Sequence, residues 1–330
     1  MSDALVIGLD VGATSTRAAV VSLAGERLGV GRGGGGNPTS HGAEQAAEQL
    51  RVALGAALTG LDPGLVRAGT IGLAGAGRLL ADPAGRAAFD RVWQEVGLRC
   101  PYEIHGDALV AYASGTSAAD GTILIAGTGA IAAAVQGLVL DRTADGHGWL
   151  LGDAGSGFWL GREAVRHTLA DLDEHRQLGL LSTLVLTQLL GSTRVATRPR
   201  DTVDVLVQTV TRRPAVELAR LAPLVVRAEQ AGDESARAIV GEAARQLAGS
   251  VGRIRPVGAT SPIVLGGGLL IGRTPLADAV RPALHARWPE APLVSAGDGA
   301  TAAAWLAART LPEVDDPADL HRRLVHPPQG

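Results

Sequence analysis

The chain has 330 residues and a mass of 33.6 kDa, with 30 basic and 33 acidic side chains and a formal net charge of −3. This length suits two lobes that each bury a core, and it excludes an isolated small binding module. A nearly neutral balance, with a pI of about 6.2, is unlike that of an electrostatic nucleic-acid binder, which carries a basic stripe or a strongly basic total. We therefore expect a small-molecule partner and no nucleic acid.

Cysteine usage and hydropathy indicate a cytoplasmic protein. Cys100 is the only cysteine, so one chain cannot form an internal disulfide, a cysteine zinc site or an iron–sulfur cluster by itself. The first nine residues include acidic Asp3 where a secretory signal has basic residues. The uncharged stretch 121–140 approaches the length of a membrane span, but Gly127-Thr128-Gly129 interrupts it, and we expect two short strands and no membrane association.

The first third of the chain alternates strand and helix patterns. A buried strand over 5–9, a polar turn over 10–16 and a returning strand over 17–23 predict a β-hairpin. The following pattern predicts a helix over 42–58, a strand over 68–73, a helix over 83–96, a strand over 102–104 and a helix from Asp107 to about Ser114.

The opening pattern returns at Thr122, with a strand over 122–126, a turn at 127–129 and a strand over 130–136. A spacing of roughly 115 residues indicates duplicated lobes and not a solenoid, whose period is 20 to 50 residues. Helices are expected at 156–172, 181–190, 202–211, 215–230, 234–251 and 299–309, and strands at 262–265 and 293–296. We predict an α/β fold with an N-terminal lobe over 1–117, a C-terminal lobe with helical insertions over 118–311, and a tail over 312–330.

Glycine is the compositional outlier: its 45 residues are roughly twice the usual share, and many fall in clusters after predicted strands. In Asp10-x-Gly12-x-Thr14-x-Thr16, exposed N–H groups and hydroxyls beside a carboxylate suit nucleotide phosphates and a magnesium ion bound mostly through water. Gly127-Thr128-Gly129 offers similar chemistry, and Gly266-Gly267-Gly268 would let an adenine or ribose lie close to the backbone. Each segment alone is also compatible with an ordinary turn, with Asp10 capping its own loop.

These segments occur in the order found in the sugar kinase, actin and heat-shock chaperone superfamily: Leu5–Thr16, Asp107, Gly127–Gly129, Gly148–Ser156 and Leu265–Gly268. Within it, the chain resembles the N-acetylglucosamine kinases and their BadF/BadG/BcrA/BcrD ATPase relatives over about residues 5–308. The most specific piece is Gly148–Gly161, where the pattern Gly-Trp-x-x-Gly-Asp-x-Gly-Ser-x-x-Trp separates this branch from actin and the chaperones. The resemblance implies two ribonuclease-H-like lobes, an actin-like ATPase fold, with a nucleotide and sugar cleft between them.

The resemblance also implies residue roles for an ATP-dependent kinase acting on an amino sugar, with N-acetylglucosamine phosphorylated at its 6-hydroxyl. Asp107 would accept the proton of the attacking hydroxyl, although an N-cap of the following helix is the alternative. Asn37, Asp107, Gly127, Thr128 and Asp153 would contact the sugar, and Asp10 would serve Mg²⁺. ATP would contact the glycine-rich turns, at Gly12, Ala13, Thr14, Thr16, Gly127, Thr128, Gly129, Gly266, Gly267 and Gly268. A homodimer is expected from family analogy alone.

Other readings stay open at this stage. Glucosamine and muramic-type sugars are alternative substrates, and Ala130 stands where relatives carry a polar residue after Gly-Thr-Gly. An activator ATPase of the BadF/BadG type would hold an iron–sulfur cluster between subunits, for which Cys100 supplies one thiol per chain. A non-catalytic sugar sensor would not need both Asp107 and Asp153. Trp149, Trp159, His105 and His147 lie close to the motifs as pocket residues or as structural ones.

Overall fold

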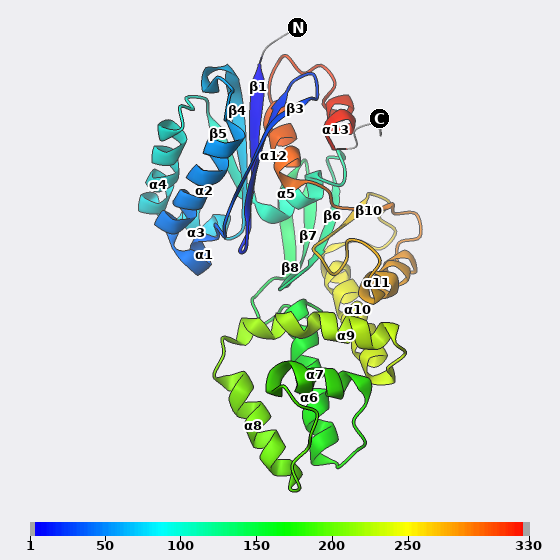
Figure 1. Ribbon diagram of the computed structural model, residues 1–330. Coiled ribbons are helices and arrows are strands. Elements are labelled where there is room, and N and C mark those ends of the chain that lie inside the picture. The colour runs from blue at the N-terminus through cyan, green and yellow to red at the C-terminus, as the bar shows by residue number, and fades with distance from the viewer. Residues whose placement is uncertain (1–3, 326–330) are drawn as a thin grey trace. The chain divides into compact units, whose positions relative to one another are not determined.

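The structure is a computed structural model that describes residues 4–325 (Figure 1). Its contacts divide the chain into two compact units. Among the described residues, the first unit runs to Ile123, takes in Val135–Leu140 and resumes at Ala296. The second unit holds Leu124–Ala134 and Asp141–Ser295.

The first unit is built on a five-stranded mixed sheet in the order β3-β2-β1-β4-β5. Its strands are β1 (Leu5–Val11), β2 (Thr16–Ser22), β3 (Arg27–Gly33), β4 (Val66–Leu73) and β5 (Tyr102–Gly106). β1 and β2 pair antiparallel, as do β2 and β3, whereas β1, β4 and β5 run parallel. The carboxyl ends of β1, β4 and β5 therefore meet at one edge of the sheet, where open α/β sheets bind ligands.

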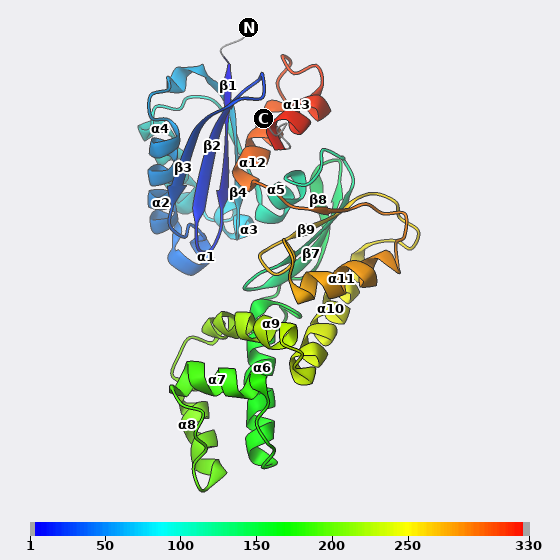
Figure 2. The ribbon, with the colours of Figure 1, turned by 45° about the vertical axis from the view of Figure 1, so that its right-hand side comes forward.

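Helices cover both faces of this sheet, with α2 (Ala43–Ala57) and α4 (Pro83–Glu95) on one face and α12 (Gly299–Ala308) on the other (Figures 1 and 2). α2 lies directly on the glycines of β3: a Cβ added at Gly31 would lie 1.9 Å from the Ala53 carbonyl oxygen. α12 approaches β1 as closely, since a Cβ at Gly8 would lie 2.0 Å from the Ala304 nitrogen. Short elements complete the unit, namely α1 (Pro38–His41), η1 (Pro63–Leu65), α3 (Ala76–Leu80), α5 (Asp107–Ala113) and α13 (Pro317–Val325).

The carboxyl-terminal part of the chain differs from the boundaries expected from sequence. α12 falls inside the range assigned to the second lobe, but it is fully buried and packs on β1, β2 and β4 of the first unit. The expected tail over 312–330 contains the helix α13. The His321 ring of α13 packs edge-on against the Trp305 ring of α12, with centroids 4.8 Å apart. Residues 326–330 lie outside the described part of the chain.

The second sheet has the order β10-β9-β6-β7-β8. Its strands are β6 (Gly121–Ala126), β7 (Ala130–Gln136), β8 (Val139–Asp145), β9 (Ile263–Gly266) and β10 (Leu293–Ser295). Three consecutive strands followed by two that add beside the first is the same succession as in the first sheet. This repetition confirms the predicted α/β fold of two related lobes. α10 (Glu234–Ile254) and α11 (Pro275–His285) contribute to the large buried core of this unit.

Between β8 and β9 the chain also forms a helical segment, residues 157–230. It contains α6 (Gly157–Asp173), α7 (Leu180–Leu190), α8 (Pro199–Thr211), η2 (Ala215–Leu221) and α9 (Ala222–Gln230). The single helix expected over 215–230 is thus divided, because Pro223 stands in the first turn of α9. Searching the described helices reveals none that combines the length and the apolar character needed to cross a membrane.

Candidate active site

Asp10 lies near the carboxyl end of β1, and the turn that follows carries a set of free backbone N–H groups. Its base is closed by a hydrogen bond from the Gly12 N–H to the Ser15 carbonyl oxygen, 2.9 Å long. Ala13 and Thr14 are exposed, and their N–H groups donate to no other residue between 4 and 325. Such unpaired N–H groups at a tight turn form a concavity that favours an anion.

Asp107 stands on the same edge of the sheet. In the register of these parallel strands, Leu73 of β4 lies opposite Gly106, the last residue of β5. Asp107 follows Gly106 directly and is the first residue of α5. Its Oδ1 accepts a hydrogen bond from the Ala108 N–H at 3.0 Å. Gly106, and not Asp107, is the N-cap residue, so the capping role considered from sequence is not the one this carboxylate has. Burial raises its pKa above the ordinary aspartate range, which favours a proton acceptor over a permanently charged group.

Two further carboxylates at this edge, Asp107 and Asp298, act on the charge of Asp10. Burial, together with the charges of Asp107 and Asp298, raises the pKa of Asp10 from 3.8 to about 6, against an opposing effect of Arg17. Sequence reasoning missed Asp298, which caps α12 by accepting from the Ala300 N–H and the Thr301 hydroxyl. The signal was an Asp-Gly pair directly before an alanine-rich helix. The residue after Asp298 is Gly299, where a larger side chain would not fit because its Cβ would lie 2.7 Å from Asp10 Oδ2.

The glycine run 33–36 packs against the same turn. Gly36 donates its N–H to the Gly12 carbonyl oxygen at 3.0 Å, and the Thr16 hydroxyl donates to the Gly34 carbonyl oxygen at 2.9 Å. Thr16 is fully buried. The expectation that Thr16 contacts the nucleotide is therefore corrected: its side chain ties the turn to the glycine run.

Asn37 follows this run, and the oxygen and the nitrogen of its side-chain amide have different roles. Its Oδ1 accepts from the Thr39 N–H at 2.8 Å and so caps α1. A Cβ at Gly75, just beyond β4, would lie 2.9 Å from the same oxygen, which places Asn37 at the edge that carries Asp107. The Asn37 amide nitrogen donates to no residue within 4–325, so its two N–H bonds stay free for a ligand.

In the second unit, the Gly127-Thr128-Gly129 turn joins β6 and β7 and is fixed to the first turn of α6. The Gly157 N–H donates to the Gly127 carbonyl oxygen at 2.7 Å, and the Phe158 N–H donates to that of Thr128 at 3.1 Å. The Gly127 and Thr128 carbonyl groups are thus directed to α6, and that of Gly129 accepts from the Gly127 N–H at 2.9 Å. The N–H groups of Thr128 and Gly129 have no acceptor among the described residues.

Asp153 lies beside this turn, in a loop that Asp145 organises. Asp153 Oδ1 accepts from the Ala130 N–H at 3.0 Å, so Ala130 contributes a backbone contact in place of a polar side chain. The buried Asp145 carboxylate accepts three N–H groups, those of Gly146, Asp153 and Ala154, at 2.8, 2.6 and 2.9 Å. Sequence reasoning did not single out Asp145, although its Asp-Gly pair is a turn signal.

The glycine run after β9 adjoins the end of β6. Gly267 has φ +82°, and a Cβ there would lie 2.2 Å from the Ala126 carbonyl oxygen, so only glycine fits. Gly268 is exposed, with open space where a side chain would be. The turns at 127–129 and 266–268 therefore follow neighbouring strands of one sheet.

Comparisons with known proteins agree with this arrangement. The family model of the BadF/BadG/BcrA/BcrD ATPases matches residues 7–306, which span both units. The chain belongs to the BadF/BadG/BcrA/BcrD ATPase family. A curated relative is the N-acetyl-D-glucosamine kinase of Dictyostelium discoideum, which is 30% identical to this chain. The match covers 62% of this chain and 64% of the relative, so the chain spans less than two thirds of the relative's length. The N-acetylmuramic acid/N-acetylglucosamine kinase of Clostridium acetobutylicum is 26% identical over 92% of this chain and 98% of its own.

Solved structures extend the likeness to the fold. A candidate N-acetylglucosamine kinase from Chromobacterium violaceum superposes with a TM-score of 0.74 at 26% identity, covering 93% of this chain and 99% of its own. A ROK family glucokinase from Streptomyces griseus, solved with glucose and AMPPNP, shares the fold with a TM-score of 0.55 at 22% identity, covering 92% and 99%.

For an ATPase of this family, the residues present suit nucleotide phosphates and a magnesium ion. The free N–H groups at residues 13–14 and 128–129 are donors for phosphate oxygens. Between residues 4 and 325 no three histidine, cysteine or acidic side chains gather closely enough to hold a metal. Asp10 alone suits Mg²⁺, which keeps several waters and takes one or two carboxylates besides the phosphates.

The aromatic and histidine residues near the motifs have mostly structural contacts. Trp159 is buried in the core of the second unit, whereas Trp149 is 43% exposed and packs on Phe158. His105 Nε2 lies 2.9 Å from Glu103 Oε2, which gives this histidine a partner other than Asp107. His147 is exposed, and burial raises the pKa of the nearby Asp153 against smaller opposing effects of the Ala130 N–H and His147.

Proposed function

We propose that this protein transfers the γ-phosphoryl group of ATP to the 6-hydroxyl of N-acetylglucosamine. The observation that carries the proposal is Asp107, a partly buried carboxylate of raised pKa at the carboxyl end of β5, on the sheet edge that also bears Asp10 and Asn37. Membership of an ATPase family and two relatives named as N-acetylglucosamine kinases support the same chemistry.

In the proposed reaction, Asp107 holds the sugar hydroxyl and accepts its proton as the oxygen bonds to the γ-phosphorus. The bond from that phosphorus to the oxygen bridging the β- and γ-phosphates breaks, and ADP leaves with the electron pair. Because such a transition state needs little covalent help, orientation and charge stabilisation supply most of the rate. The Ala108 N–H, which donates to Asp107 Oδ1, holds the carboxylate in one orientation.

Each unit supplies a glycine turn whose free N–H groups suit the phosphates of the nucleotide. In the first unit these are the N–H groups of Ala13 and Thr14, and in the second those of Thr128 and Gly129. Asp10 would hold Mg²⁺ through water, and the ion would neutralise charge on the phosphates. The exposed backbone at Gly268 suits the flat face of the base or the ribose.

Each unit also offers a polar side chain for the hydroxyls of a sugar, Asn37 in the first and Asp153 in the second. The Asn37 amide has two free N–H donors for sugar hydroxyl oxygens, and Asp153 keeps Oδ2 free to accept from a hydroxyl while Oδ1 holds the Ala130 N–H. A hydrogen-bonding site of this kind discriminates strongly against a sugar that lacks the matching hydroxyl.

The decisive experiment measures ADP release with N-acetylglucosamine, glucosamine, N-acetylmuramic acid, glucose and no sugar. We expect the highest kcat/KM with N-acetylglucosamine and a product phosphorylated at C6, identified by NMR. Hydrolysis that no sugar stimulates would indicate an activator ATPase, and sugar binding without turnover would indicate a sensor; either result contradicts the proposal. Glu103→Gln changes an exposed acid on β5, the strand that precedes Asp107, and is the matched control for substitutions at Asp107.

A further inference from the structure

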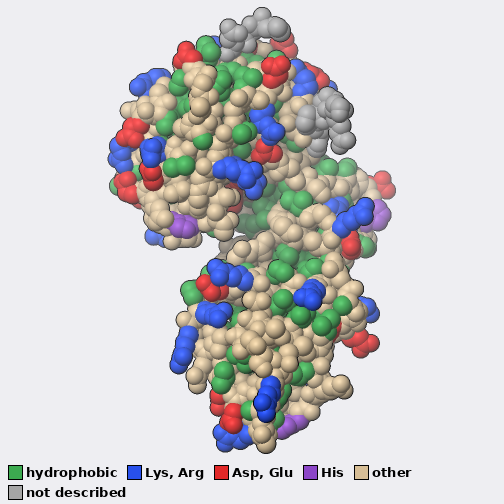
Figure 3. Space-filling view, viewed as in Figure 1, with side chains coloured by type: hydrophobic (Ala, Val, Ile, Leu, Met, Phe, Trp, Pro, Cys, Tyr) green, Lys and Arg blue, Asp and Glu red, His purple; other side chains and the backbone are tan. Residues whose placement is uncertain are grey.

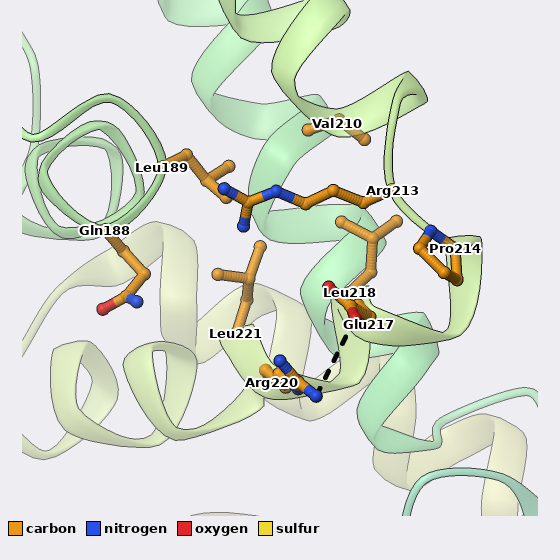
Figure 4. A pocket seen from close by; sticks show the side chains of 9 residues that line it. All are labelled: Gln188, Leu189, Val210, Arg213, Pro214, Glu217, Leu218, Arg220 and Leu221. Atoms are coloured by element: carbon orange, nitrogen blue, oxygen red, sulfur yellow. Dashed lines mark ion pairs between the residues drawn. The ribbon is translucent and has the colours of Figure 1, made fainter.

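A small cavity in the helical segment lies outside the proposed active site (Figure 4). It has a volume of about 100 Å³ and lies between the end of α7, the end of α8 and η2. Its apolar wall is formed by four side chains: Leu189, Val210, Leu218 and Leu221. Two arginines, Arg213 and Arg220, and one acid, Glu217, also line it, and Arg213 lies at its exposed side.

The charge at this cavity is unbalanced. Arg220 lies 3.8 Å from Glu217, whereas the Arg213 side chain forms no hydrogen bond or ion pair with any residue in the described range 4–325. In Figure 4 the Arg213 guanidinium extends toward Leu189, beside the leucines of the wall. An unpaired cation beside an apolar wall matches a ligand with one anionic end and one apolar end.

The surrounding surface reinforces this preference. Residues 180–230 contain seven arginines and four acidic residues, a net charge of +3 in a chain whose total is −3. Figure 3 shows basic side chains spread over the face of the helical segment that it presents. The local field therefore attracts anions although the protein as a whole is slightly acidic.

The volume limits the size of the apolar end. An engineered protein cavity of about 150 Å³ takes up benzene, whose ring has six carbons. By proportion, about 100 Å³ accommodates roughly four carbons. A hexose or a nucleotide is far too large, so the substrates of the proposed reaction do not fit this cavity.

The cavity wall is in direct contact with the helix that holds the Gly127-Thr128-Gly129 turn. A Cβ at Gly161 of α6 would lie 1.9 Å from the Leu218 carbonyl oxygen, so η2 and α6 touch through their backbones. Four residues earlier on α6, the Gly157 N–H donates to the Gly127 carbonyl oxygen. A shift of η2 on ligand binding would therefore press on the helix that positions a proposed phosphate-binding turn.

We propose that this cavity binds a short-chain monocarboxylate of about four carbons, and that its occupation changes nucleotide affinity at the turn. The carboxylate pairs with Arg213, and the alkyl chain lies against Leu189, Val210, Leu218 and Leu221. The binding part is independent of the proposed sugar kinase activity, because it is measured without sugar, ATP or turnover.

The first test is calorimetric titration of the full chain with sodium butanoate, acetate, hexanoate, butylammonium and 1-butanol. We expect butanoate to bind with a Kd on the order of 1 mM, a usual range for a ligand of six heavy atoms. Acetate and hexanoate should bind more weakly, and the cation and the alcohol should show no saturable binding. Absence of saturable butanoate binding, or equal binding of butylammonium, would overturn the proposal.

Paired variants locate the site. Arg213→Gln should weaken butanoate binding about tenfold, since it removes a charged hydrogen-bond donor. Arg212→Gln, the exposed neighbour outside the cavity lining, should leave the affinity unchanged. Val210→Phe fills the cavity and should abolish binding, whereas Val207→Phe on the exposed side of the same helix should not. Equal effects within either pair would refute the location.

The second part needs a readout at the nucleotide. Titration with AMPPNP, with and without saturating butanoate, should show a change in Kd of about fivefold, the lower end of usual coupling between two sites. The change should vanish in Val210→Phe, which abolishes butanoate binding, and persist in Arg212→Gln. An unchanged AMPPNP affinity would refute the coupling, and a chain that binds AMPPNP and butanoate but phosphorylates no sugar would count against the kinase proposal alone.

Discussion

The Asp145 carboxylate is predicted to hold the loop that carries Asp153. It is 7% exposed, and it accepts N–H groups from Gly146, Asp153 and Ala154. Its own backbone has φ +65°, a conformation that asparagine tolerates and alanine does not. Asp145→Asn therefore removes one accepting oxygen and the charge while keeping the backbone preference, whereas Asp145→Ala removes all three hydrogen bonds and adds strain.

The expected magnitudes follow from these contacts. Asp145→Asn should destabilise the closed loop by about 2 kcal/mol, the net value of one hydrogen bond to a charged group. Asp145→Ala should cost roughly 4 kcal/mol, because three N–H groups lose a charged acceptor and a positive φ is left without support. Hydrogen exchange followed by mass spectrometry on peptides covering 145–157 measures the local opening free energy without assuming that both units unfold together.

Sugar kinetics supply a second measure of the same loop. A looser Asp153 should raise the KM for the sugar more than that for ATP in Asp145→Asn. Asp141→Asn is the matched control, because Asp141 lies on the same strand but is exposed and paired with Arg142. Unchanged protection of 145–157 in Asp145→Ala would show that other contacts hold the loop, and the reasoning would fail.

Three further outcomes follow from the described contacts. Asp107→Asn should lower kcat by about 10²- to 10⁴-fold, the usual contribution of a general base, with the thermal midpoint kept; an active variant would refute the role. Because the folded-state pKa of Asp10 is about 6 against an ordinary 3.8, unfolding free energy should fall by roughly 3 kcal/mol as the pH rises between these values. In metal-free protein, Asp10→Asn should raise the unfolding free energy by this amount at pH 7.5 and leave it unchanged at pH 4, as measured by denaturant titration. Gly31→Ala should destabilise by about 3 kcal/mol through overlap with the Ala53 carbonyl, whereas Gly55→Ala, with open space around it, should stabilise α2 slightly.

Strands and helices with a clear hydrophobic period could be predicted from the sequence. The two hairpins at 5–23 and 122–136 stand out because short apolar runs flank a polar, glycine-containing turn, and both correspond to observed strand pairs. β3 could not be found in this way, since its sequence RLGVGRG has few strand-forming residues. It forms because three alternate glycines let α2 lie on its backbone, a tertiary contact that no local pattern reveals.

The site was predictable in its motifs and less so in its side-chain roles. The spacing of Asp10, Gly12 and Thr14 marks an exposed turn, but nothing in it shows that the next hydroxyl, on Thr16, points inward to Gly34. Asp298 and Asp145 escaped notice because each acts on backbone groups of its own loop or helix. An Asp-Gly pair has the same appearance in sequence whether it lies in a surface turn or beside a site.

The burial of α12 against β1 has a consequence for biosynthesis. β1 is synthesised well before its covering helix, which comes only with residues 299–308, after the chain of the second unit. The nascent first unit must therefore wait with one sheet face open, whereas the second unit, complete at Ser295, can fold before it. Vectorial synthesis thus favours an order in which the second unit, encoded between the two parts of the first, folds earlier, and the first unit is completed when α12 is added.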